Sequence, residues 1–90
     1  MLKIVDDIDL KELEKFGFKP KYDEDTGKIY KYVHRYEINK DASKIDLEIK
    51  KDIYLRGQYD YIEYWKIHLL EFEGIEILYD LVKAGLVEKV

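Results

Sequence analysis

The clearest regularity in the chain is an alternation of apolar and polar side chains over residues 45–55, IDLEIKKDIYL. The odd positions are apolar except for Lys51, and the even positions are mostly charged. This pattern is typical of a strand with one buried face. Residues 28–38 and 59–69 also alternate, and a further strand is expected around Pro20, because proline is confined to edge strands and strand starts. The pattern therefore predicts four consecutive strands.

The last two of these strands are expected to form a hairpin, because one register matches the character of the facing side chains. A loop over residues 56–58 places Leu55 opposite Tyr59. The same register brings Lys51, the one basic odd position, opposite Glu63, the one acidic odd position. We expect the odd face of the hairpin to be buried under the last helix. The aromatic side chains assigned to this core are Tyr59, Tyr61 and Trp65.

End signals predict a short helix over residues 10–16. Asp9 is a suitable N-cap, Glu12 completes a capping box, and Gly17 supplies a left-handed residue at the C-terminal end. A second helix is predicted over residues 73–84, with an inward stripe of Ile75, Leu78, Leu81 and Val82. The expected fold is α+β, an antiparallel four-stranded meander with a short N-terminal helix and a C-terminal helix (α-β-β-β-β-α).

The bulk composition indicates a small intracellular domain. The 90 residues make a single domain, 1–90. Cysteine is absent, which excludes disulfides and thiolate nucleophiles and fits a reducing cytoplasm. No apolar run approaches the ~20 residues of a membrane span, and the first residues, MLKIVDD, lack the pattern of a secretion signal. We therefore expect a cytoplasmic protein that does not bind membranes.

The net charge of −4 arises in the second half of the chain. Residues 1–45 carry ten basic and ten acidic side chains, whereas residues 46–90 carry six and ten. Binding to a phosphate backbone needs clustered lysine and arginine, so direct nucleic-acid binding is not expected. An acidic surface can instead imitate nucleic acid, or it can serve solubility alone. The residues of this candidate acidic surface are Glu71, Glu73, Glu76 and Asp80.

The chain offers little catalytic chemistry. Its one serine and one threonine lie in predicted turns. His34 and His68 are expected on opposite sheet faces, which argues against a shared metal. Residues 23–27 follow the start of a calcium loop, but the position for its bidentate glutamate is His34. Lys51 and Glu63 form either an acid–base pair or a plain ion pair at a sheet end that the helices leave uncovered. We expect no enzymatic activity, no metal and no cofactor.

A protein-binding surface has better support than an active site. The face of the hairpin opposite the predicted core carries tyrosine and aliphatic side chains interleaved with charges, and tyrosine is a favoured interface residue. The alternative is that the N-terminal helix covers this face through its apolar stripe. The residues of the candidate surface are Ile29, Val33, Tyr54, Asp60, Ile62 and Tyr64.

Two segments give the chain a resemblance to known proteins. DDIDLKELEKFGFK at residues 6–19 and LYDLVKAGLVEKV at residues 78–90 resemble small uncharacterised phage and prophage proteins of Gram-positive bacteria. These segments consist mainly of helix caps, glycines and core positions, so the resemblance implies a fold rather than a catalytic motif. It also implies a setting in which short acidic proteins bind and disable host machinery.

Three functions are compatible with these observations. The first is a phage-encoded inhibitor of a host defence complex, with an anti-CRISPR protein that blocks a Cas effector nuclease as its most specific form. It would act in the host cytoplasm by steric occupancy or by acidic mimicry of nucleic acid. The second is a homodimeric structural or assembly protein of the phage particle. The third is a small enzyme that uses Lys51 and Glu63.

Overall fold

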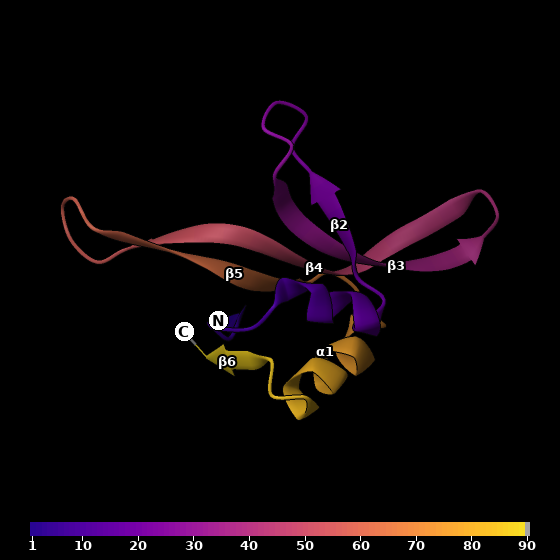
Figure 1. Ribbon diagram of the computed structural model, residues 1–90. Helices are drawn as coiled ribbons and strands as arrows, with labels where there is room; N and C mark the ends of the chain where they lie inside the picture. The colour runs from indigo at the N-terminus through magenta and orange to yellow at the C-terminus, as the bar shows by residue number, and fades with distance from the viewer. Residues whose placement is uncertain (90) are drawn as a thin grey trace.

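The computed structural model describes residues 1–89 and shows an α+β fold built on one antiparallel sheet of six strands (Figure 1). Along the chain the elements are β1 (Leu2–Ile4), η1 (Leu10–Phe16, a 3₁₀ helix), β2 (Lys19–Tyr22), β3 (Ile29–Asn39), β4 (Ala42–Leu55), β5 (Tyr61–Leu69), α1 (Gly74–Lys83) and β6 (Val87–Lys89). The prediction of an α+β fold with an antiparallel sheet is confirmed.

The sheet has the strand order β2-β3-β4-β5-β1-β6. Strands β2 to β5 form the predicted meander, but β1 pairs with β5 and then with β6, so the prediction of four strands is wrong. The two additional strands have three residues each, which is too short for any alternation to be recognised. The two ends of the chain consequently lie side by side at one edge of the sheet (Figure 1).

The predicted ends of the first helix are largely confirmed. The Asp9 carboxylate accepts a hydrogen bond from the Lys11 amide, and Gly17 has the left-handed φ of 88°. The amide of Phe18 then donates to the carbonyl of Leu13 at 3.3 Å. The capping box is wrong, because the Glu12 carboxylate pairs with Lys15 at 2.9 Å instead of reaching back to the N-cap.

Both helices pack against the same face of the sheet (Figure 1). Leu13 of η1 and Leu81 of α1 belong to one buried cluster, so the alternative in which the N-terminal helix covers the opposite face is wrong. In α1 the predicted inward positions Ile75 and Val82 are exposed, and Ile77 contributes to the core instead. The buried cluster consists of Ile4, Leu13, Phe18, Tyr32, Leu47, Ile49, Ile67 and Leu81.

The hairpin of β4 and β5 is confirmed, but its register differs from the prediction by two residues. Leu55 lies opposite Tyr61, and the loop spans five residues, Arg56 to Asp60. A shift of two residues leaves every side chain on its predicted face, so alternation alone cannot distinguish the two registers. The predicted ion pair survives as a diagonal contact, with Lys51 Nζ 3.2 Å from Glu63 Oε2.

The strands are much longer than the helices that cover them. The 14 residues of β4 span about 46 Å at ~3.3 Å per residue, whereas the ten residues of α1 span about 15 Å. The helical layer therefore covers only the centre of the sheet, where Trp65 packs edge-on against Tyr32 at 5.6 Å. The assignment of Tyr59 and Tyr61 to the core is wrong, because both lie beyond this layer and are exposed.

Candidate functional site

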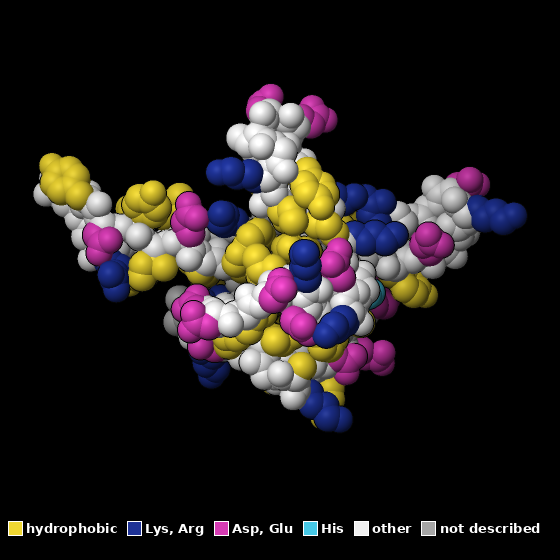
Figure 2. Space-filling model, viewed as in Figure 1, with side chains coloured by type: hydrophobic (Ala, Val, Ile, Leu, Met, Phe, Trp, Pro, Cys, Tyr) yellow, Lys and Arg dark blue, Asp and Glu magenta, His cyan; other side chains and the backbone are white. Residues whose placement is uncertain are grey.

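The end of the β4–β5 hairpin projects from the molecule as a two-stranded ribbon, which we call the β4–β5 arm and define as residues 53–62 (Figure 1). Strand β3 pairs with β4 only as far as Lys50, and the helices lie against the centre of the sheet. Figure 2 shows the hydrophobic side chains in yellow along this arm, on the left of the view. The arm carries six exposed apolar side chains: Ile53, Tyr54, Leu55, Tyr59, Tyr61 and Ile62.

The arm exposes apolar side chains on both of its faces. Ile53 and Tyr61 share one face, whereas Tyr54 and Ile62 lie opposite each other on the other. Exposure is greatest near the tip, at 70% for Leu55 and 91% for Tyr59. A two-stranded hairpin with no packed face is only marginally stable in water, and contiguous exposed apolar surface is rare on monomeric proteins.

Three residues of the predicted binding surface lie on the arm. Tyr54 and Ile62 line a small cavity of 90 Å³ at its base, together with Lys3 and with Tyr64, a fourth predicted residue. Asp60 lies in the tip and pairs with Arg56, with 3.3 Å between Nη2 and Oδ2. The structure thus brings Tyr54, Ile62 and Tyr64 together and places Asp60 farther out along the same arm.

The other predicted binding residues are not exposed surface. Val33 is 1% exposed, and it lies between Lys19 of β2 and Glu48 of β4 in the sheet. Ile29 packs against the core. Tyr64 is buried as well, and its hydroxyl donates to Met1 Sδ at 3.3 Å. Burial, followed by the neighbouring Asp52 carboxylate, raises the pKa of the Tyr64 hydroxyl.

Salt bridges explain why Val33 is buried on a face that no helix covers. Lys31 and Lys50 both reach the Glu48 carboxylate, at 3.5 and 3.3 Å, on the same face of the sheet as Val33. Their aliphatic stems cover apolar surface while the charges remain in contact with water. This part of the predicted binding surface is therefore closed by side chains of the sheet itself.

A second feature of the structure arises from a β-bulge in β4. His34 pairs with Leu47, but the next residue of β3, Arg35, pairs with Ile45, so that Asp46 is the extra residue. The bulge brings the Asp46 carboxylate to His34, with 3.1 Å between Oδ2 and Nδ1.

The bulge is also anchored by the backbone. The Asp46 carbonyl accepts hydrogen bonds from the amides of Leu70 and Glu71, at 3.0 and 3.2 Å. Gly74 begins α1 directly above this carbonyl, and a Cβ atom at Gly74 would lie 2.5 Å from the Asp46 oxygen. The start of α1 therefore rests on the bulge, which fixes the wall of the cavity beside it.

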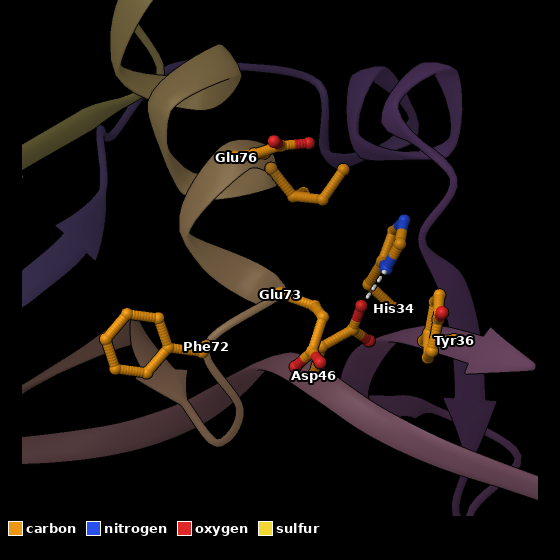
Figure 3. Close-up of a pocket in the computed structure, with 7 residues that line it drawn as sticks. His34, Tyr36, Asp46, Phe72, Glu73 and Glu76 are labelled. Carbon is orange, nitrogen blue, oxygen red and sulfur yellow. Dashed lines mark hydrogen bonds and ion pairs between the residues drawn. The ribbon is translucent and has the colours of Figure 1, made fainter. Parts of the chain in front are cut away.

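A cavity of 320 Å³ opens next to the bulge (Figure 3). The Asp46 side chain is only 3% exposed, and its Oδ1 atom has no hydrogen-bond partner in the described part of the chain. Figure 3 shows its carboxylate between the labelled side chains of His34, Tyr36 and Glu73. The cavity is lined by His34, Tyr36, Asp46, Phe72, Glu73, Glu76 and Ile77.

The predicted acidic surface is divided by this cavity. Glu73 and Glu76 line it, Glu71 is half-buried, and Asp80 lies exposed farther along α1. The contribution of Asp46 could not be predicted from the alternation, which places this even, charged position on the face opposite the predicted core. A charged residue at an even position is what an ordinary half-buried strand also has, so the alternation gives no sign of a bulge at Asp46.

The candidate acid–base pair is in contact, whereas the two histidines lie apart. Lys51 and Glu63 form a half-exposed ion pair, with 3.2 Å between Nζ and Oε2. His34 lies on the helix-covered face with Leu47, whereas His68 lies on the other face. Among residues 1–89, no three histidine, aspartate or glutamate side chains are arranged to hold a metal ion.

The helices of residues 1–89 also lack the combination of length and apolar character that a membrane crossing requires. Comparison with known proteins adds no relative from which a role could be transferred. A scan against protein-family models gives no match, and searches of curated proteins and of solved structures give none either.

Proposed function

We propose that the protein acts by binding another protein through the β4–β5 arm, without catalysis of its own. The observation that carries this proposal is the set of six exposed apolar side chains on a hairpin that the rest of the fold does not cover. Tyrosine and other aromatic residues dominate binding energy at protein interfaces, and the arm contains three tyrosines.

The proposed partner is a host defence complex, with a Cas effector nuclease as the most specific form, and the proposed place of action is the host cytoplasm. The resemblance of the two end segments to phage proteins of Gram-positive bacteria supports this choice. The arm supports steric occupancy more directly than acidic mimicry, because it offers a projecting apolar element that can enter a groove of a larger protein.

The experiment expresses the chain in a Gram-positive host with an active Cas nuclease and counts plaques of a targeted phage. The wild-type chain should restore infection, and the double variant Leu55→Ser/Tyr59→Ser should lose most of this effect. The matched control Tyr22→Ser/Val82→Ser changes one exposed tyrosine and one exposed aliphatic residue away from the arm, and it should retain the effect. Equal plaque counts for all three chains would contradict the proposal.

Self-association is the second candidate, and one observation favours it. Residues 51–55 of β4 pair with β5 alone, which leaves their other backbone edge without a strand in the described chain. Two copies can pair such edges antiparallel about a two-fold axis. Sedimentation equilibrium decides this candidate: a mass near the 10.9 kDa of one chain at all concentrations rejects the homodimer.

A further inference from the structure

We propose that the cavity beside the bulge binds the guanidinium group of an arginine from a partner protein. We define this site, the bulge pocket, by Asp46, Glu73 and Glu76 as its acidic residues and Tyr36 and Phe72 as its aromatic residues. The proposal does not depend on the function of the β4–β5 arm, because the pocket lies on the helix-covered side of the sheet, near the start of α1.

Charge is the first reason. Three carboxylates line the pocket, and none of them forms an ion pair with a lysine or arginine anywhere in residues 1–89. Elsewhere in the chain Glu48, Asp52 and Glu63 each have a lysine within 4.0 Å. The bulge pocket is thus a place where three carboxylates converge, with His34 on one of them and no lysine or arginine of residues 1–89 on any.

The state of Asp46 is the second reason, and it is independent of the count of acids. Its side chain is 97% buried, one of its oxygens is held by His34, and the other has no partner. An unpaired buried carboxylate oxygen is unfavourable, because it has lost its water without gaining a donor. A cationic ligand that enters the pocket relieves this by supplying positive charge next to it.

The shape and the walls favour guanidinium over ammonium. The volume of 320 Å³ lies at the lower end of the roughly 300–1,000 Å³ of ligand pockets, which suits a single side chain rather than a cofactor. Guanidinium is planar, stacks on aromatic rings and donates to two carboxylates at once, whereas ammonium is a compact point charge. Tyr36 supplies a ring beside the Asp46 carboxylate (Figure 3), and Glu73 and Glu76 supply the accessible carboxylates.

The experiment titrates the isotope-labelled chain with the capped tripeptide Gly-Arg-Gly and follows the backbone amide resonances by NMR. Saturable shifts are expected for residues around the pocket, such as Tyr36, Glu73 and Ile77. The peptide with citrulline in place of arginine has the same shape without the charge. It should bind at least about tenfold more weakly, and the lysine peptide should lie between the two.

Variants distinguish binding in the pocket from a general attraction of the positively charged peptide to an acidic protein. Glu73→Gln/Glu76→Gln should weaken the arginine peptide at least about tenfold. The control Glu24→Gln/Asp25→Asn removes the same charge from the exposed β2–β3 turn and should leave the affinity unchanged. Asp46→Asn should also weaken binding. Because this substitution also changes the side chain that contacts His34, the amide spectrum of the variant protein is recorded to verify its fold.

Three results would overturn the proposal. One is an equal affinity for arginine and citrulline, and another is an equal affinity for arginine and lysine. The third is an equal loss in the pocket variant and in the turn variant. If the chain binds the arginine peptide but does not restore infection in the plaque assay, the proposed function is rejected and the proposal for the bulge pocket still stands.

Discussion

Asp46 is the residue on which most of the local structure around the pocket depends. Its carbonyl holds the turn that leads to α1, and its carboxylate holds His34. The ring of His34 packs edge-on against Phe18 at 5.6 Å, and its Nε2 lies 3.1 Å from where a Cβ of Gly17 would be. One bulged residue therefore ties β3, η1 and the start of α1 together.

The contact between Gly74 and this residue can be tested by a single methyl group. Gly74→Ala places a Cβ against the Asp46 carbonyl and the Leu69 side chain, so the helix must shift. We expect the free energy of unfolding to fall by about 1–3 kcal/mol, although alanine is the better helix former. Urea unfolding measures this. In the control Gly57→Ala the added Cβ meets no atom within 4 Å, and the free energy of unfolding should not change. An equal effect of both variants would show that the contact with Asp46 is not the cause.

Three groups make the stability of the fold sensitive to alkali. Burial raises the pKa of Tyr32 and Tyr64 above 10.0, and hydrogen bonds to Glu88 and then Asp6 raise the pKa of Lys3 above 10.5. In each case the folded state favours the protonated form. The stabilisation is therefore complete below the unfolded pKa and is lost as the pH rises through the folded pKa.

Urea unfolding at about pH 8 and about pH 11 should accordingly show a lower free energy of unfolding at the higher pH. The variant Tyr32→Phe removes one of the titrating hydroxyls and should show a smaller difference between the two pH values. A difference as large as that of the wild-type chain would show that ionisation of Tyr32 does not contribute.

At the scale of elements, the mismatch in length between strands and helices determines which surface is free. The buried part of β4 ends at Ile49, although the strand continues to Leu55. Within residues 1–89, positions 51–55 pair with β5 alone, and the Arg56 amide donates to the Asp60 carbonyl at the tip. Substitutions at exposed positions of the β4–β5 arm should therefore leave the stability of the fold unchanged.

Leu55→Ser and Tyr59→Ser should each change the free energy of unfolding by less than about 0.5 kcal/mol, because their side chains are already in water. Leu47→Ala, at a fully buried position of the same hairpin, should lower it by about 2–5 kcal/mol. Chemical unfolding of the three variants gives the comparison. A large loss from either arm variant would show that the arm belongs to the core.

Much of the element structure could be predicted from the chain, because alternation and capping are local signals. The strands around Val33, Ile49 and Ile67, the left-handed Gly17 and the helix that ends before Gly85 follow from them. The bulge at Asp46, the two-residue shift of register and the placement of both helices on one face depend on contacts between distant segments. Neither alternation nor capping carries that information.

At the scale of the whole molecule, the same limit explains the outcome for the candidate site. The alternation placed Tyr54 and Ile62 on the same face of the hairpin, opposite the predicted core, and the two residues do lie together on the arm. It could not show that the helices stop short of Tyr59 or that lysine stems close over Val33. The molecule extends 48 Å along its longest axis, and its β4–β5 arm carries six of the large apolar side chains that the described residues leave exposed.

The most direct test of the arm as a binding element is site-specific photo-crosslinking in the host cell. A benzophenone amino acid replaces Tyr59 in the tip of the arm or, as the control, Tyr22 in β2, which is also exposed. We predict one discrete adduct from position 59 that is lost in the Leu55→Ser background, and no such adduct from position 22. The same adducts from both positions, or none from position 59, would contradict it.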